Sequence, residues 1–229
     1  MNKINNNEYE QADFQGVYKG KSLLTSAEIK SVPWDIGHAQ PVVCTILDQA
    51  ESGKLLDVGC GLGHNAEAAA QRGFQVTAID SAAVAIMCCK KSMKGDIRFL
   101  VRDVCATKLD ESFDLILDSA LYHAIPFNTR IPYLQEMRRL SHNETRLHII
   151  TFAPAKYGMP LPLAIQLSEI CYNAEATGWS INSVSRVEYK GNADAITDFC
   201  ERKNLIILTD NAGFTRLPCW HVVLQVLSQ

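Results

Sequence analysis

Apolar and polar positions along the chain predict strands and helices in turn. Five short apolar runs, bounded by glycine or polar residues, predict buried strands. They cover residues 54–58, 74–80, 97–101, 113–117 and 146–152. Helices are predicted over residues 65–72, 81–94 and 133–140, the second of them with Ser81 as its N-cap. Strands that alternate with helices across short turns favour βαβ units and a mainly parallel sheet.

The flanks of this core predict further elements. On the N-terminal side we expect helices over residues 22–30 and 41–51, separated by Pro33 and Gly37. On the C-terminal side we expect helices over 164–176 and 193–203 and strands over 179–189 and 219–227. The pattern therefore predicts one α/β unit with seven strands and helices on both faces of the sheet.

A glycine-rich turn joins the first strand of the core to the next helix. Its sequence is Leu55-Leu56-Asp57-Val58-Gly59-Cys60-Gly61-Leu62-Gly63. Glycine allows positive φ and the close approach of a ligand to the backbone, and the N-terminus of the helix offers free N–H groups. The spacing G-x-G-x-G differs from the G-x-G-x-x-G of dinucleotide-binding folds, because His64 stands at the last glycine position.

Acidic residues stand where four successive strands end. They are Asp57, Asp80, Asp103 and Asp118. The carboxyl ends of parallel strands line the ligand crevice of an open α/β sheet, so these four residues are expected at one edge. One such Asp could be a simple helix cap, but four in register favour a binding site.

With these residues in place, the chain resembles the class I S-adenosylmethionine-dependent methyltransferases. LLDVGCGLG, VTAID, VRDV and FDLILDSALYHAI are similar to the first four motifs of that family, in order, over roughly residues 40–155. The resemblance implies a Rossmann-like fold and S-adenosylmethionine as cofactor. It places Gly59, Cys60, Gly61 and Gly63 around the methionine and ribose. It further implies contacts from Asp57, Asp80, Ser81, Asp103, Val104 and Asp118.

The segment before the core carries a more restricted resemblance. Pro33-Trp34-Asp35-Ile36-Gly37-His38-Ala39-Gln40-Pro41 is similar to a subset of small-molecule methyltransferases that includes thiopurine-type and tellurite-resistance-type members. In that subset the N-terminal segment covers cofactor and substrate. We therefore expect a lid over residues 1–40 and a methyltransferase domain over 41–229, with Trp34 either at the cofactor or packed on the core.

The residues after the fourth strand are the candidates for chemistry. Asp118, Tyr122 and His123 follow that strand, beside the methyl position that the resemblance implies. Methyl transfer is an in-line displacement in which the cofactor carries the reactive carbon, and a base is needed only for a protonated acceptor. His123 is the expected base, with Tyr122 as a substrate contact. A structural role for either residue remains an alternative.

Composition narrows the partner to a small molecule. The 22 Lys and Arg against 25 Asp and Glu give a net charge of −3, and no basic run is present, which argues against nucleic acid. No apolar run reaches the ~18 residues of a membrane span, and the polar N-terminus has no signal-peptide character. Eight scattered cysteines without C-x-x-C indicate reduced thiols and a cytoplasmic protein, and no spacing indicates a metal site.

Two alternatives to a small-molecule methyltransferase stay open at this point. One is an NAD(P)-linked oxidoreductase, which the G-x-G-x-G spacing, Asp103 and Asp118 disfavour. The other is a non-catalytic regulator that binds S-adenosylmethionine. Binding of S-adenosylmethionine rather than NADH distinguishes a methyltransferase from the oxidoreductase. Release of S-adenosylhomocysteine distinguishes it from the non-catalytic regulator.

Overall fold

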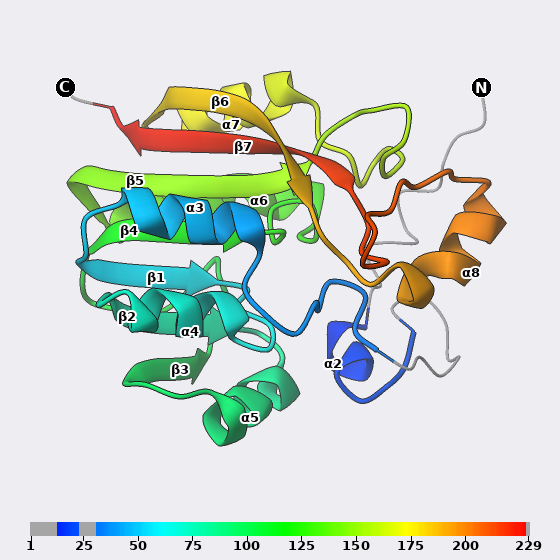
Figure 1. Ribbon diagram of the computed structural model, residues 1–229. Coiled ribbons are helices and arrows are strands. Elements are labelled where there is room, and N and C mark those ends of the chain that lie inside the picture. Colours follow the sequence, from blue (N-terminus) through cyan, green and yellow to red (C-terminus); the bar gives the residue numbers. More distant parts are fainter. Residues whose placement is uncertain (1–12, 23–30, 228–229) are drawn as a thin grey trace.

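The computed structural model describes residues 13–22 and 31–227 and contains one seven-stranded sheet (Figure 1). The strands are β1 (Lys54–Val58), β2 (Gln75–Asp80), β3 (Ile97–Val101), β4 (Phe113–Ser119), β5 (Ser141–Phe152), β6 (Trp179–Tyr189) and β7 (Leu217–Val226). Their order across the sheet is β3-β2-β1-β4-β5-β7-β6. Strands β1 to β5 pair in parallel, while β7 runs antiparallel to both β5 and β6. The Rossmann-like, mainly parallel sheet expected from the sequence is confirmed.

Helices cover both faces of the sheet. On one face lie α3 (Pro41–Gln49), α4 (His64–Gln71) and α5 (Ala83–Ser92), whose apolar side chains pack with Leu55, Ala78 and Leu117. On the other face lie α6 (Arg130–Arg139) and α7 (Leu167–Ala176), packed on Leu56 and Ile116. The core strands are buried on both sides, and therefore their sequences are continuous apolar runs instead of alternating apolar and polar residues.

Two helices lie beyond the carboxyl ends of the parallel strands. These are α2 (Phe14–Val17) near the N-terminus and α8 (Ala193–Lys203) between β6 and β7 (Figure 1). A 3₁₀ turn, η1 (Phe127–Thr129), precedes α6. The predicted helix over 193–203 is confirmed, whereas most of the helix predicted over 22–30 lies outside the described residues.

Several element boundaries differ from the predicted ones, and two of these differences have a local cause in the structure. Ser81 is not the N-cap of α5, because the helix starts one residue later and Ala82 holds that position. The Asp80 side chain replaces a cap, since its Oδ1 accepts the Ala82 N–H at 2.8 Å. Strand β5 begins at Ser141 rather than at residue 146, with a register shift opposite Phe113. There the Thr145 hydroxyl donates to the Phe113 carbonyl at 2.6 Å, which holds the extra residues on the sheet.

Candidate functional site

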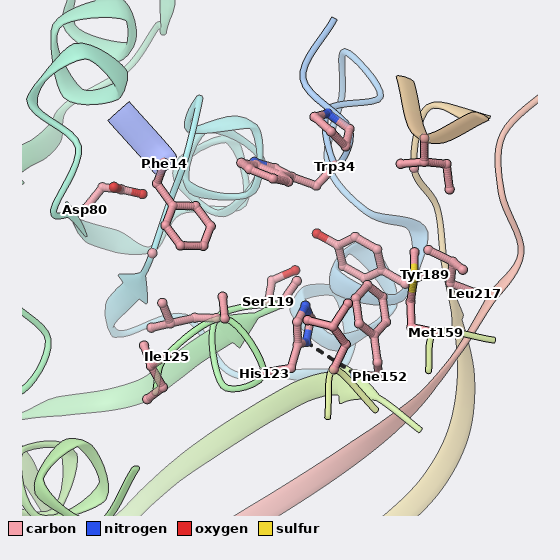
Figure 2. Close-up of a pocket in the computed structure, with 18 of the residues that line it drawn as sticks. Phe14, Trp34, Asp80, Ser119, His123, Ile125, Phe152, Met159, Tyr189 and Leu217 are labelled. Carbon is pink, nitrogen blue, oxygen red and sulfur yellow. Dashed lines mark hydrogen bonds between the residues drawn. The ribbon is translucent and has the colours of Figure 1, made fainter. Parts of the chain in front are cut away.

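A cavity of about 640 Å³ lies at the carboxyl ends of the parallel strands. Its floor is formed by the ends of β1, β2 and β4, and α2, the segment around Trp34 and α8 contribute to its walls. Figure 2 shows Asp80 and Phe14 at one end, Met159 and Leu217 at the other, and Ser119 and His123 between them. A volume of this size is typical of a site for small organic molecules.

Within the glycine loop, Gly59 lines this cavity, whereas Cys60, Gly61 and Gly63 line a smaller pocket that shares Gly59, Trp34, Ser119 and Tyr189 with it. Gly59, Gly61 and Gly63 all have positive φ, at 69°, 54° and 83°. The N–H groups of Gly59 and Cys60 both donate to the Ile79 carbonyl, which ties the loop to β2. A Cβ on Gly61 would stand 2.9 Å from the Tyr18 hydroxyl oxygen, so only glycine fits there without displacement.

Asp80 faces the cavity from the end of β2. Its Oδ2 accepts the Gly61 N–H at 2.9 Å, and its Oδ1 accepts the Ala82 N–H at 2.8 Å. Burial raises the pKa of Asp80 above its ordinary value, while these N–H donors lower it. Each carboxylate oxygen keeps lone-pair capacity for a further donor, such as a ligand hydroxyl. Ser81 also lines the cavity.

The residues after β3 form the next part of the wall. Asp103, Val104 and Cys105 all line the cavity, and the Asp103 Oδ1 accepts the Cys105 N–H at 2.8 Å. Asp103 is exposed and Val104 is buried. A carboxylate beside an apolar side chain is a suitable surface for an adenine ring with its amino group.

Asp57 and Asp118 lie behind the cavity wall instead of facing into it. Neither is among the lining residues, and both are buried. Asp57 accepts a hydrogen bond from the Ala66 backbone in α4, and its Oδ2 has no partner among the described residues. Burial, followed by the charges of Asp80 and Asp118, raises the pKa of Asp57 to about 7. Asp57 therefore holds the start of α4 and does not reach the cavity for the cofactor contact that the resemblance implies.

The position of Asp118 does not agree with the expected contacts to cofactor and substrate. Its Oδ1 accepts the N–H groups of Leu121 and Tyr122, at 2.9 and 3.1 Å, and its Oδ2 accepts the Tyr133 hydroxyl at 2.8 Å. Burial raises the pKa of Asp118 to about 7. The carboxyl group is therefore occupied with holding the chain that follows β4.

Tyr122 likewise lies behind the cavity wall and does not reach the cavity. It is fully buried, its ring lies near the Arg130 guanidinium at 5.3 Å, and its hydroxyl accepts from Asn173 at 2.9 Å. The expected contact between Tyr122 and substrate is corrected on this geometry. The turn held by Asp118 sends the side chain of residue 122 into the core and that of His123 to the cavity.

His123 does line the cavity, on the side away from Asp80 (Figure 2). Its ring stacks on Phe152 with centroids 3.9 Å apart, and its Nδ1 lies 3.2 Å from the Thr151 hydroxyl. The Phe152 N–H donates to the same nitrogen at 3.4 Å. Burial, followed by the nearby Arg130, lowers the pKa of His123 to about 3, so the ring is neutral at working pH.

The N-terminal segment reaches the cavity through three aromatic side chains. Phe14 and Tyr18 project from α2 and its C-terminal end, and the Trp34 indole N–H donates to the Tyr18 hydroxyl at 3.2 Å. The Trp34 ring lies 5.9 Å from Phe14 and 6.0 Å from Tyr18. Trp34 therefore packs against the core and the aromatic side chains of this segment and also lines the cavity, and its contact with the cofactor stays a prediction.

Several lining residues were not identified from the sequence. Phe14 and Tyr18 are four apart, and Ile196 and Phe199 are three apart on α8, so both pairs have helical spacing. This spacing was a usable signal of one apolar helix face. It could not show that these faces cover the cavity, because both helices are distant in sequence from the glycine loop.

The other histidines and the cysteines have local partners or lie away from the cavity wall. His64 pairs with Asp35 at 3.2 Å, and the His38 ring approaches Phe214 edge-on. All eight cysteines are free, including Cys60, which is buried in the glycine loop. Across residues 13–22 and 31–227, no three His, Cys, Asp or Glu side chains come together as a metal site. No helix in the described part of the chain is long and apolar enough to cross a membrane.

The comparisons with known proteins agree with this geometry. Residues 55–144 match the family model described as a methyltransferase domain, a stretch that spans the glycine loop, Asp80, Asp103 and His123. This stretch is a methyltransferase domain. With the expected fold confirmed, the activity is methyl transfer with S-adenosylmethionine as the cofactor, and the oxidoreductase alternative is set aside.

Similar proteins extend over most of the chain. A 2-heptyl-1-hydroxyquinolin-4(1H)-one methyltransferase from Mycobacteroides abscessus is 26% identical over 218 residues, which is 90% of this chain and 93% of that protein. A solved structure from work on the conversion of a disulfide bond into a thioacetal group during echinomycin biosynthesis has a TM-score of 0.74 at 23% identity. The match covers 93% of this chain and 91% of the chain in that structure. A TehB-like methyltransferase from Corynebacterium glutamicum has a TM-score of 0.58 at 19% identity, with coverage of 80% and 86%. The methyltransferase fold thus spans more of the chain than residues 55–144.

The residues of the cavity fit S-adenosylmethionine. The cofactor carries a ribose diol and an adenine amino group, which are donors, and Asp80 and Asp103 present carboxylates to the cavity. The positive φ at Gly59 brings backbone to the cavity wall, and a Cβ there would stand 3.0 Å from the Leu121 side chain. When bound, the cofactor supplies a methyl group on a positively charged sulfur.

Proposed function

We propose that the chain methylates an apolar ring compound that carries one O, N or S nucleophile. The observation that carries this proposal is the composition of the cavity beyond the cofactor-side residues. That part is lined mainly by apolar side chains, namely Ile125, Phe152, Met159, Leu163, Ile196, Phe199 and Leu217. Transfer of an apolar ring from water to such a surface is favourable by about 25 cal/mol per Å² of apolar area buried.

The proposed roles of the site residues divide the cavity into two ends. Asp80 binds the ribose hydroxyls, Asp103 the adenine amino group, and Gly59 and Gly61 border the methionine part. Residues 13–22 and 31–40, which are the described parts of the predicted lid, and α8 together cover the cavity, so the lid includes a piece of the C-terminal third of the chain. Holding the acceptor at near-attack distance and excluding water are then the main contributions of the protein.

The relatives support a small-molecule acceptor. The Mycobacteroides abscessus relative is named for a heptyl hydroxyquinolone, an apolar ring with a hydroxyl group, and it aligns with 90% of this chain. We therefore place the acceptor of this chain in the same broad class. We also propose a cytoplasmic location, because all eight cysteines are unpaired and reduced thiols are typical of that compartment.

The test is S-adenosylhomocysteine release over a panel of acceptors. We expect release with hydroxylated or thiolated aromatic rings and little release with short polar alcohols and amines. Phe199→Ala, which removes an apolar wall, is expected to raise the KM of a good acceptor about tenfold. The matched control is Tyr172→Ala on α7, whose ring is 70% exposed and does not line the cavity. If the cofactor binds and no acceptor raises release, the non-catalytic regulator is the better reading.

A further inference from the structure

Three hydrogen-bonding groups meet at one place on the otherwise apolar wall. They are the His123 ring, the Ser119 hydroxyl and the Tyr189 hydroxyl, all of which line the cavity. Figure 2 shows Ser119 between Tyr189 and His123, with the polar ends of these side chains turned toward one another. Ser119 ends β4, His123 follows in the turn after β4, and Tyr189 ends β6, so the tertiary fold brings the three side chains together.

The backbone decides which nitrogen of His123 carries the proton. The Phe152 N–H can only donate, and it points at Nδ1 at 3.4 Å. Nδ1 must therefore accept, and the Thr151 hydroxyl at 3.2 Å donates to it as well. A neutral imidazole has one donor and one acceptor nitrogen, so the proton is on Nε2. The ring edge with Nε2 is the one turned from the Phe152 backbone toward the cavity (Figure 2).

This tautomer has a chemical consequence. The nitrogen that faces the acceptor is a donor and has no free lone pair, so it cannot remove a proton from a neutral acceptor. The expectation that His123 is a general base is corrected by this geometry. The Nε2–H group forms its strongest hydrogen bond with an atom that already carries negative charge.

The two hydroxyl groups add to the same donor set. The Ser119 Oγ is buried and has no partner of ordinary hydrogen-bond geometry, although the Tyr189 hydroxyl lies close to it. Burial raises the pKa of Tyr189, so that its hydroxyl keeps its proton and remains a donor. A buried hydroxyl without a partner is costly unless a ligand completes it.

The charged groups around the ring do not supply a base in place of His123. Arg130 on α6 lies near it and forms an ion pair with Glu169 at 2.5 Å, and Asp118 on β4 is occupied by three donors. The remaining titratable residues of the cavity wall are Tyr18, Asp80, Asp103, Cys105 and Arg202. Asp80 lies at the other end of the cavity from Met159 and Leu217 (Figure 2), and Asp103 belongs with it to the proposed cofactor side.

We propose that His123, as its Nε2–H tautomer, binds the acceptor as an anion together with the Ser119 and Tyr189 hydroxyls. This inference rests on the proposed methyl transfer. It restricts the substrate to an aromatic or heteroaromatic hydroxyl or thiol acidic enough to ionise near neutral pH. A lone pair of the anionic oxygen or sulfur forms the new bond to the methyl carbon, and the electron pair of the broken carbon–sulfur bond stays on the cofactor sulfur. No proton has to pass to the protein.

A spectroscopic titration tests this without turnover. A nitrophenol, whose anion is coloured, is bound to the protein in the presence of S-adenosylhomocysteine, and its ionisation is followed against pH. The bound phenol is expected to ionise about one pH unit lower than the free phenol. His123→Phe should abolish that shift, whereas His123→Gln should keep most of it, because the Gln amide still offers N–H near the Nε2 position. His142→Phe, distant on β5, is the control and should keep the full shift.

Turnover gives the second readout. Over a series of ring hydroxyls, the rising limb of kcat/KM against pH is expected to follow the acidity of each acceptor. His123→Phe should lower kcat about 100-fold, in the range found for loss of one donor to a developing anion, and His123→Gln less than tenfold. Any one of three results would overturn the inference. These are a rising limb of kcat/KM at the same pH for all acceptors, a bound phenol that ionises at the same pH as the free phenol, and equal losses of kcat in His123→Phe and His123→Gln.

The outcomes separate the inference from the function on which it rests. Methylation of neutral alcohols or amines as fast as of acidic hydroxyls, with no shift of a bound phenol, would overturn the inference and leave methyl transfer standing. Absence of both phenol binding and methylation over the whole panel would overturn the proposed function, and the inference with it.

Discussion

Asp118→Ala tests whether this carboxyl group holds the site together or takes part in methyl transfer. The side chain is fully buried and accepts the Leu121 and Tyr122 N–H groups and the Tyr133 hydroxyl, at 2.9, 3.1 and 2.8 Å. Its removal leaves two buried donors and the half-buried Leu121 N–H without an acceptor, each at a cost of about 1–3 kcal/mol. Even at the low end of that range, we expect the free energy of unfolding to fall by about 3 kcal/mol.

Two matched variants grade this effect. Asp118→Asn keeps one oxygen for the two backbone N–H groups, so the expected loss is about 1–2 kcal/mol. Tyr133→Phe removes one donor together with its hydrogen bond and should cost about 1 kcal/mol. Urea unfolding with an unchanged m-value is the assay. A loss below about 1 kcal/mol for Asp118→Ala, or one no larger than that of Tyr133→Phe, would refute the reasoning.

The pH dependence of the same variants has a defined sign. Burial raises the pKa of Asp118 to about 7 from an ordinary value of 3.8. A raised pKa in the folded state gives stability that is full below about pH 4 and is lost as the pH rises through about 7, by at most about 1.4 kcal/mol per pH unit. Asp118→Asn does not ionise, so the stability gap between it and the natural chain should narrow from pH 5 to pH 8. A constant gap would contradict the raised pKa.

Catalysis provides the remaining distinction for Asp118. If it acts through the position of the turn before His123, Asp118→Asn should keep kcat within about tenfold, a loss of about 1.4 kcal/mol. A loss of about 1,000-fold, with near-natural stability and cofactor affinity, would instead show that the carboxyl group acts in the reaction.

Three further predictions concern other parts of the site and the sheet. Asp80→Ala should weaken cofactor binding by about 1–3 kcal/mol in calorimetry, since it removes a buried acceptor, and unchanged affinity would exclude it from the site. Gly61→Ala should lower the thermal midpoint more than Gly73→Ala, because both have positive φ but only a Cβ on Gly61 meets another group, and equal effects would disprove the contact. Burial lowers the pKa of His148 to about 3, so stability should fall as the pH drops from about 6.5 toward 3; His148→Asn should flatten that fall and the control His142→Asn should not.

Much of the fold follows from local patterns in the sequence. The strands over Lys54–Val58, Ile97–Val101 and Trp179–Tyr189 and the helix over Ala193–Lys203 begin and end where periodicity predicts. Boundaries differ where a distant side chain intervenes, as where Thr145 binds Phe113 and extends β5. Local periodicity contains no information about such partners, so it misplaces those ends.

The candidate site divides in the same way. The side proposed for the cofactor carries a sequence signal, because the glycines at a strand-to-helix turn and the acidic residues Asp80 and Asp103 each stand in a short stretch of the chain. The acceptor side was not, because its wall comes from α2, β4, β5, β6 and α8. Asp118 shows the difference: its place at a strand end was predicted correctly, but which way its carboxyl group points depends on Tyr133.

By itself, the sequence determined the class of fold, the edge of the sheet where the cavity lies and the family of the cofactor, since each depends on residues close together in the chain. Only the tertiary structure decided which acidic groups face the cavity and which nitrogen of His123 carries a proton. The physical reason is that hydrogen bonds orient side chains. The Phe152 N–H that orients His123 lies 29 residues away and one strand across the sheet.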